Sequence, residues 1–305
     1  MPTHLKNRLS HALLGVVITA GAVTSVATPA QATPQAGSVV SPDSRSHVPA
    51  VAPDAPAVLG RAAHLIDAKT GKVHFSKKAD LRTPVASITK VMTAYTVLKE
   101  AKPADVVEVT SADVRYASKG GASVADLRAG DRLTVETLLH ALLLPSGADA
   151  AHALARAYGP GVDAFTAKMN ANARELGMKD TLYVNADGMP AKGGGYSTAR
   201  DQVRLAQAAL DNKTIRKVSS TQYHSVPATA EHSAYSWRNT NRLLRTPGAV
   251  GLKTGYTRAA GYTLAFAADG DGRRLVGVIL GETSSSRRFE TAQALLDWAA
   301  TSRQP

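Results

Sequence analysis

The sequence lacks cysteine, so no disulfide can stabilise the fold. Aromatic residues make up only 5% of the chain, and neither a basic helix nor a base-stacking module is evident. These absences argue against nucleic acid as a partner, although the formal net charge is +12. The nine histidines show no His-x-x-x-His pairing, which argues against a metal site. We therefore expect a protein stabilised by its apolar core, with a basic surface suited to anionic surroundings.

The N-terminal residues have the pattern of a secretory signal peptide. Lys6 and Arg8 precede an apolar run that begins at Ala12, and small residues surround a cleavage position after Ala32. The apolar run is shorter than the roughly 20 residues that a membrane span needs. We therefore predict that residues 1–32 are a signal peptide and that the mature protein is secreted or extracytoplasmic.

The rest of the chain divides by composition. Residues 33–60 are rich in proline and alanine and contain no aromatic residue, which predicts a disordered linker. Residues 61–302 are enough for one large domain, with a helical subdomain at about 104–215. Because the chain ends at Pro305, soon after its last predicted helix, we expect a single monomeric unit without a further C-terminal domain or anchor.

The order of the predicted elements indicates an α+β fold. One strand pair around the turn at 68–71 comes first, helical patterns fill the middle, and a run of strands and a final helix follow. The late elements are strands at 222–227, 233–239, 251–257, 262–268 and 275–280, and a helix at 287–300. We therefore expect an antiparallel β-sheet flanked by helices and completed by both ends of the chain, plus an all-helical subdomain.

A serine and a lysine three residues apart open the first predicted helix. Thr83 and Pro84 have the pattern of an N-cap followed by proline at the first helical position, and helical periodicity continues to about Ala101. Ser87 and Lys90 then share one face of the first turn. A lysine kept neutral by burial can activate a serine hydroxyl as a nucleophile. The pattern is short and also arises when a capping serine precedes an exposed lysine, so further motifs must decide.

Two further patterns carry polar groups suited to a binding cleft. Ser146 interrupts two apolar helices, where a short turn can fix a serine while its hydroxyl faces a cleft. Lys253, Thr254 and Gly255 lie on a predicted strand, and a lysine and a hydroxyl beside a glycine suit a substrate carboxylate along the strand edge. A second Lys-Thr-Gly at 69–71 is interpreted as part of a hairpin turn.

Ser-x-x-Lys, a later serine and Lys-Thr-Gly, in this order, form the motif set of penicillin-binding proteins and class A β-lactamases. With the stretches 129–151, 176–188 and 239–257, these motifs make the chain resemble a D-alanyl-D-alanine carboxypeptidase, a low-molecular-mass penicillin-binding protein of the serine DD-peptidase and β-lactamase-like superfamily. The resemblance covers roughly residues 62–300. It implies a wall-associated enzyme, without metal or cofactor, that acts on peptidoglycan stem peptides ending in D-Ala-D-Ala and is inhibited covalently by β-lactam antibiotics.

The resemblance also implies a role for each motif residue. Ser87 would attack the carbonyl of the penultimate D-alanine to form an acyl-enzyme, with Lys90 as base, and Ser146 would relay the proton to the departing D-alanine. The implied substrate-binding residues are Lys253, Thr254, Gly255, Tyr256 and Thr257. Lys253 and Thr254 would hold the terminal carboxylate, and the backbone N–H groups of Ser87 and Tyr256 would form the oxyanion hole. Water would then release the acyl group in a carboxypeptidase, or an amine would in a transpeptidase.

One departure from the family pattern leaves alternatives open. The second motif is normally Ser-x-Asn, but here it ends in Ala148. Losing the amide hydrogen bond costs roughly 1–3 kcal/mol unless another group replaces it, so a catalytically weakened, wall-binding homologue is one alternative. Another is a class A-like β-lactamase, which needs a glutamate to activate the deacylating water. Glu175 and Glu231 are the glutamates between the second and third motifs, and neither falls where residues 185–188 read Asn-Ala-Asp-Gly, the expected place of that base.

Overall fold

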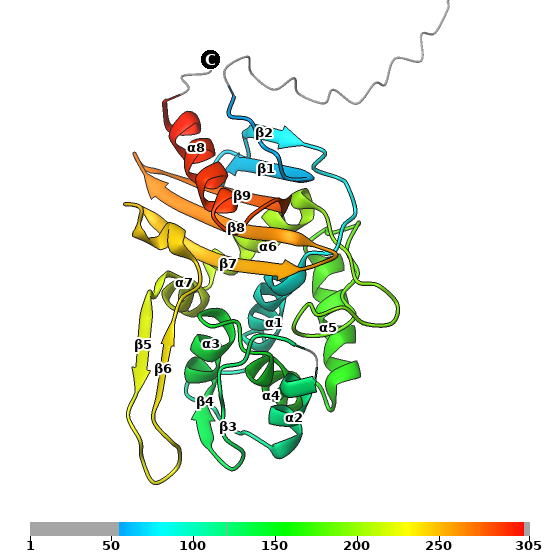
Figure 1. Ribbon diagram of the computed structural model, residues 1–305, viewed down its shortest axis with the longest axis vertical. Helices are drawn as coiled ribbons and strands as arrows, with labels where there is room; N and C mark the ends of the chain where they lie inside the picture. The colour runs from blue at the N-terminus through cyan, green and yellow to red at the C-terminus, as the bar shows by residue number, and fades with distance from the viewer. Residues whose placement is uncertain (1–54, 120, 302–305) are drawn as a thin grey trace, which may run out of the picture. The chain divides into compact units, whose positions relative to one another are not determined.

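The computed structural model describes residues 55–119 and 121–301 (Figure 1). The predicted signal peptide and most of the predicted linker lie outside these residues. Strands β1 and β2 open the described chain. Helices α1 to α7 follow, with β3 and β4 on either side of α2; the hairpin of β5 and β6 comes next, and strands β7 to β9 and helix α8 close the chain. The α+β prediction is therefore confirmed.

The five strands of the main sheet are β1 (Ala62–Asp67), β2 (Val73–Lys77), β7 (Ala249–Thr257), β8 (Gly261–Gly270) and β9 (Arg273–Glu282). Their order is β2-β1-β9-β8-β7 and every neighbouring pair is antiparallel. The first strands of the domain thus pair with the last strand of the sheet, as predicted. In this order β7 is an edge strand, paired on one side only, with β8.

The helices are α1 (Thr89–Val97), α2 (Ser111–Lys119), α3 (Val135–Leu143), α4 (Ala148–Tyr158), α5 (Val162–Glu175), α6 (Ala199–Asp211), α7 (Lys213–Ser220) and α8 (Arg287–Thr301). Short 3-10 helices are η1 (Ala86–Ile88) and η2 (Arg242–Arg245). Two small two-stranded sheets pair β3 (Val106–Glu108) with β4 (Arg132–Thr134), and β5 (Tyr223–Val226) with β6 (Tyr235–Arg238). Among the described residues, no helix is both long and apolar enough to cross a bilayer.

The sheet packs on both of its faces because successive side chains of a strand point to opposite sides. In β1, Ala63 and Leu65 pack in one core with the apolar face of α8, which covers this side of the sheet (Figure 1). Ala62 and Ile66 pack in a second, larger core with the helices of the other side. Two buried faces explain why all six residues of β1 are inaccessible to solvent.

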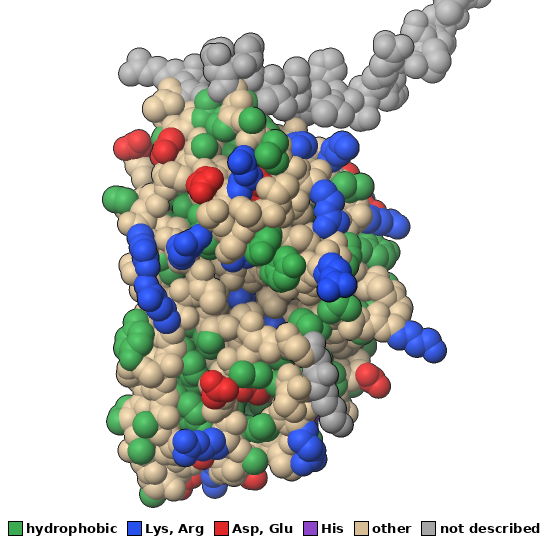
Figure 2. Space-filling model, viewed as in Figure 1, with side chains coloured by type: hydrophobic (Ala, Val, Ile, Leu, Met, Phe, Trp, Pro, Cys, Tyr) green, Lys and Arg blue, Asp and Glu red, His purple; other side chains and the backbone are tan. Residues whose placement is uncertain are grey.

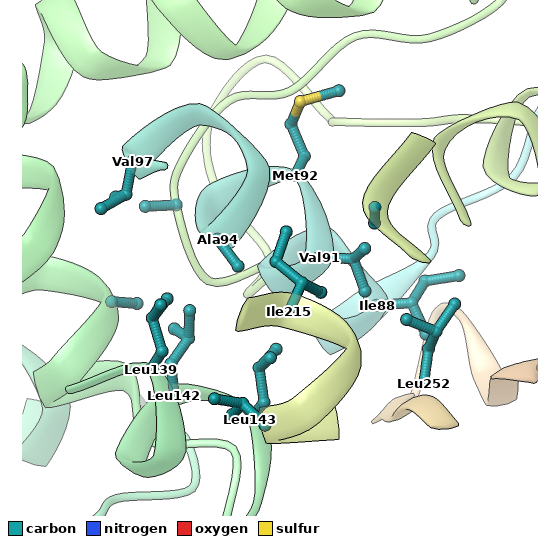
Figure 3. Packing of buried hydrophobic residues seen from close by; sticks show 14 of the residues in the cluster. Ile88, Val91, Met92, Ala94, Val97, Leu139, Leu142, Leu143, Ile215 and Leu252 are labelled. Carbon is teal, nitrogen blue, oxygen red and sulfur yellow. The ribbon is translucent and has the colours of Figure 1, made fainter. Parts of the chain in front are cut away.

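Helix α1 lies at the centre of the larger core. Figure 3 shows its side chains between leucines of α3, Ile215 of α7 and Leu252 of β7. Eight of its nine residues are buried, including the polar Lys90. Each fully buried aliphatic side chain contributes about 1.5–3 kcal/mol relative to an exposed one, so the position of α1 is fixed by packing on several sides.

The start of α1 differs from the sequence prediction. Thr83 does not cap the helix; its backbone pairs instead with that of Ser197, in an isolated antiparallel bridge. Ser87 lies in the preceding 3-10 helix η1, and the α-helix begins only at Thr89. The serine and Lys90 still come together, because the 3-10 turn runs directly into the α-helix.

Candidate active site

A cavity of about 620 Å³ opens beside the edge strand β7. Figure 2 shows the face in question hollowed near its middle, with Lys or Arg side chains visible at depth. The motifs contribute Ser87, Ser146 and residues 254–257 to its wall. The other lining residues are Gly121, Ala122, Ser123, Met189, Pro190, Thr240, Arg258 and Arg288. Three segments that the sequence places far apart therefore meet around one space.

Ser87 and Lys90 form the hydrogen-bonded pair that the sequence predicts. The Nζ atom of Lys90 lies 3.1 Å from the Oγ atom of Ser87 and donates to the backbone carbonyl of Asp187 at 2.8 Å. Lys90 is only 1% exposed. Burial lowers its pKa to about 8, although the carboxylates of Asp187 and Asp149 favour the charged form. About a tenth of this lysine is then neutral at pH 7, which suits a base that takes the proton of the serine.

The loop at residues 185–188 holds the lysine from the other side. The hydroxyl of Thr93 donates to the carbonyl of Ala186 at 2.6 Å, which fixes the loop to α1. A Cβ atom at Gly188 would lie 2.0 Å from the carbonyl oxygen of Ala86, so only glycine permits this approach to η1. The carbonyl of Asp187 thereby faces Lys90, and the loop acts as a support for the lysine.

Ser146 occupies the turn between α3 and α4, as its sequence context predicts. Its φ angle is +74°, a left-handed conformation that is uncommon outside glycine, and the residue is 5% exposed. Within the described part of the chain, its hydroxyl has no hydrogen-bond partner. A buried hydroxyl that lines a cavity without a partner is available to a bound substrate.

The residues after Ser146 anchor this turn. Ala148 is fully buried at the start of α4 and is not part of the cavity wall. The carboxylate of Asp149 accepts hydrogen bonds from the backbone N–H groups of Ala125 and Leu127, at 3.0 and 3.1 Å. The second motif is thus tied to the segment that follows α2. This segment also contributes residues to the cavity wall.

Lys253 directly precedes the cavity-lining Thr254 on β7 and is not itself part of the cavity wall. It is 1% exposed, and its Nζ atom donates to the carbonyl of Thr254 at 3.0 Å. Burial, and then the cations of Lys90 and Arg288, hold the pKa of Lys253 well below its ordinary value. This repulsion among cations means that an anion bound here would be strongly stabilised.

Thr254 and Gly255 bring β7 against the serine. The hydroxyls of Thr254 and Thr240 are 2.7 Å apart. A Cβ atom added at Gly255 would lie 2.4 Å from the hydroxyl of Thr263 and 2.9 Å from the backbone nitrogen of Ser87. Glycine is therefore required for this close approach of the strand to the serine, a contact that the sequence did not predict.

Tyr256 and Thr257 complete the predicted set with different surroundings. The side chain of Tyr256 is exposed and stacks on Tyr262, with ring centroids 4.4 Å apart. The hydroxyl of Thr257 accepts a hydrogen bond from the backbone of Ala260, within the turn to β8. Both residues line the cavity.

The sequence reasoning missed Arg288 and Thr240. Arg288 is 7% exposed on α8, and its guanidinium donates to the carbonyl of Gly255 at 2.9 Å. Burial and the neighbouring cation of Arg242 lower its pKa. A signal was available, because Arg288 shares the apolar face of its helix with Ala292 at a spacing of four. Thr240 offered no comparable signal.

The glutamates considered for a β-lactamase lie elsewhere. Glu175 pairs with Lys99 at 2.5 Å, and Glu231 pairs with Arg132 at 3.2 Å, both on the surface. Neither lines the cavity. The deacylating base of a class A-like enzyme is therefore not supplied by either of them.

Comparison with known proteins identifies the family of this chain. A model of the D-alanyl-D-alanine carboxypeptidase family matches residues 49–284. The chain belongs to this family. It is thus a hydrolytic peptidase, and the alternatives of a β-lactamase and of a non-catalytic wall-binding module are disfavoured.

Relatives and solved structures agree with the family. The D-alanyl-D-alanine carboxypeptidase of Streptomyces sp. strain K15 is 34% identical over 275 residues, which cover 86% of this chain and 94% of that protein. DacF of Bacillus subtilis is 33% identical over 245 residues, 78% of this chain but only 61% of the relative. The crystal structure of the Streptomyces K15 DD-transpeptidase superimposes with a TM-score of 0.77 at 35% identity, over 81% of this chain and 99% of that one. A penicillin-binding protein homologue from Mycobacterium tuberculosis gives a TM-score of 0.76 at 32% identity, over 82% of this chain and 95% of that one.

Proposed function

We propose that this DD-peptidase cleaves D-Ala-D-Ala termini of peptidoglycan stem peptides through an acyl-enzyme on Ser87. The observation that carries the proposal is the 3.1 Å contact between the Ser87 hydroxyl and Lys90, whose burial lowers its pKa to about 8. An ordinary exposed lysine is almost fully protonated at neutral pH and could not accept the proton of the serine. The same pair accounts for covalent inhibition by β-lactams, which would acylate the same serine.

Acylation uses the groups around the cavity in turn. The Oγ atom of Ser87 bonds to the carbonyl carbon of the penultimate D-alanine while its proton passes to the neutral amine of Lys90. The carbonyl oxygen becomes an oxyanion that the backbone N–H groups of Ser87 and Tyr256 stabilise, a contribution of about 3 kcal/mol per donor. As the C–N bond breaks, the hydroxyl of Ser146 passes a proton to the leaving nitrogen and is reprotonated from Lys90.

The terminal carboxylate of the substrate sits at the cationic end of the cavity. Lys253 and Thr254 hold it, and the guanidinium of Arg288 adds positive charge next to Gly255. An anion at this position also offsets the repulsion among the buried cations. The requirement for a free carboxylate then follows from charge, and it fixes the scissile bond opposite Ser87.

Deacylation decides between two outcomes. Water attacks the ester and gives its proton to Lys90, and the Ser87 hydroxyl is restored, which is carboxypeptidase activity. An amine that reaches the acyl-enzyme forms a new peptide bond instead, which is transpeptidase activity. The Streptomyces K15 relative is named for both reactions, so we expect acceptor access to set the balance here.

Intact-protein mass spectrometry after incubation with benzylpenicillin tests the nucleophile. The wild type is expected to gain a persistent one-to-one adduct, and Ser87→Ala none. Ser123→Ala serves as the matched control because Ser123 lines the same cavity outside the motifs. An adduct on folded Ser87→Ala would refute the assignment, and rapid drug consumption with a transient adduct would indicate a β-lactamase.

We also propose that the enzyme is exported and works at the cell wall as a monomer. The signal-peptide pattern and the positive net charge support this proposal, because anionic wall polymers attract a basic surface; of the full chain's +12, only Lys6 and Arg8 lie within residues 1–32. The mature protein recovered from its native host should begin at Thr33 and sediment as one chain. A chain that retains residues 1–32 in the cytoplasm would overturn the proposed localisation.

A further inference from the structure

A second cavity, of about 500 Å³, adjoins the catalytic one. We call it the arginine groove, defined by Arg238, Asn241, Arg242, Arg245 and Arg288 in its wall. No acidic residue contributes to this wall. Figure 2 shows Lys and Arg side chains gathered to one side of the central hollow.

The arginines of the groove lack the carboxylate partners that other surface arginines have. Arg82 pairs with Asp180 at 2.6 Å, and Arg200 pairs with Asp80 at 2.7 Å. In the described part of the chain, by contrast, Arg238 and Arg245 form no ion pair, and Arg242 lies over the ring of Phe289 at 4.9 Å. The positive charge of the groove is therefore not neutralised by the protein around it.

Buried donors in the wall of the groove are also unsatisfied. Asn241 is 2% exposed; its Oδ1 atom accepts from the backbone of Leu243 at 3.1 Å, whereas its Nδ2 atom has no acceptor among the described residues. The Nε atom of Arg288 is likewise without an acceptor there. Most buried polar groups in folded proteins are paired, so two unused donors beside unpaired guanidiniums indicate a place for an anionic acceptor.

The groove joins the catalytic cavity at its carboxylate end. Thr240 and Arg288 line both cavities. Thr240 contacts the hydroxyl of Thr254 at 2.7 Å, and Arg288 donates to Gly255 at 2.9 Å. If Thr254 holds the terminal carboxylate of the substrate, the groove begins where the leaving residue ends. A D-alanine side chain is a single methyl group and leaves such a space empty.

We propose that the arginine groove binds a second carboxylate, carried by a leaving or accepting residue larger than D-alanine. This inference rests on the proposed function, which places the leaving residue at Thr254. A carboxylate suits the site because peptides are the substrates on this side, and their anionic groups are carboxylates. Arginine pairs with this group through two parallel hydrogen bonds. The enzyme is thereby selective for an acidic residue on the leaving side of the scissile bond.

Three N-acylated dipeptides with the same D-alanine donor and a terminal D-Ala, D-Glu or D-Gln test the proposal. Release of the terminal amino acid by the full chain is measured at low ionic strength, where exposed charges are least screened. We expect kcat/KM for D-Glu to exceed that for its neutral isostere D-Gln about tenfold, the effect of one charge-assisted hydrogen bond. Arg245→Gln and Arg238→Gln should each reduce this ratio toward one, whereas Lys213→Gln, which removes an equal charge outside both cavities, should keep it.

The outcomes separate the groove from the catalytic proposal. Equal rates for D-Glu and D-Gln in a wild type that cleaves D-Ala-D-Ala would refute the groove alone. Failure to cleave any of the peptides, with no penicillin adduct, would refute the catalytic proposal. Inorganic phosphate is a further probe: if it inhibits both substrates through Arg245 while D-Glu gains no preference, the groove binds a free anion and the assignment to the leaving residue is wrong.

Discussion

The chain contains the tripeptide Lys-Thr-Gly twice, in two very different environments. At 69–71 it forms the exposed turn between β1 and β2, where the carboxylate of Asp67 accepts hydrogen bonds from two of its backbone N–H groups. At 253–255 it lies buried on an edge strand against Ser87. The same three residues form a turn in one place and part of a buried strand in the other. Burial and neighbouring cations, which lower the pKa of Lys253, distinguish the second copy from the first.

Replacing the lysine of each copy should give the largest difference in activity between the two. Lys253→Ala is expected to lower kcat/KM for a D-Ala-D-Ala peptide about a hundredfold, because a charge-assisted bond to the substrate carboxylate is lost. Lys69→Ala should leave kcat/KM unchanged, since Lys69 is exposed and outside the cavity. Steady-state kinetics and thermal unfolding of both variants provide the measurement. If Lys253→Ala lost stability as severely as it lost activity, its assigned role in recognition would fail.

The two glycines make the next comparison. Gly255→Ala places a methyl group 2.9 Å from the backbone nitrogen of Ser87, so the strand must move and acylation should slow about thirtyfold. Gly71 has a φ of +73° in open space, so alanine there strains the turn by about 1–2 kcal/mol without reaching the site. The rate of penicillin acylation and the midpoint of urea unfolding distinguish the two effects. If Gly71→Ala also slowed acylation, the expected difference between the two glycines would be contradicted.

The dependence on pH sharpens the role of burial. Lys90 has a pKa lowered to about 8, so its neutral form, which is the base, becomes more abundant as the pH rises. The value of kcat/KM should therefore rise about fivefold between pH 7 and pH 8, rise up to about twofold more above pH 8, and then level off. A pH profile at low substrate concentration measures this directly. A profile that is flat from pH 6 to pH 9 would show that Lys90 is not the titrating base.

At position 148 the comparison is reversed, because alanine stands where the family motif normally has asparagine. Ala148 is fully buried, so Ala148→Asn must force a larger polar group into a packed position. We expect the free energy of unfolding to fall by about 1–3 kcal/mol, with acylation changed by no more than about twofold. Chemical denaturation and penicillin acylation measure both quantities. Faster acylation at unchanged stability would instead show that the amide reaches the cavity and that the wild type lacks it.

The strands and long helices were predictable because their periodicity is local. Expected strands at 251–257 and 275–280 correspond to β7 and β9, which are longer by a few residues at their ends. The predicted start of α1 was wrong because Thr83 bonds to Ser197 instead of capping the helix. Ser197 lies more than 100 residues away along the chain, and no local pattern encodes this contact. The short strands β3 and β4 and helix α7 were also missed, since three to eight residues carry too little periodicity.

The site could be predicted where motifs carry it. Ser87, Ser146, Thr254 and Gly255 line one cavity and Lys90 contacts Ser87, while the catalytic roles assigned to them remain predictions. The carbonyl of Asp187 could not be found, because a backbone group has no residue-type signature. Arg288 could have been found from its place on an apolar helix face. The arginine groove could not, since it joins η2, β6 and α8 only in the fold.

The pairing of β1 with β9 has a consequence for the order of assembly. Ala62 and Leu280 are partners across the sheet although more than 200 residues separate them. Closing a loop of this length is slow, because its entropy must be lost before the contacts form. A chain that emerges from its N-terminus onward can build the helices around α1 early, but the sheet waits for the last strand. Since Lys253 and Gly255 belong to that sheet, catalytic competence is among the final properties that a newly made molecule acquires.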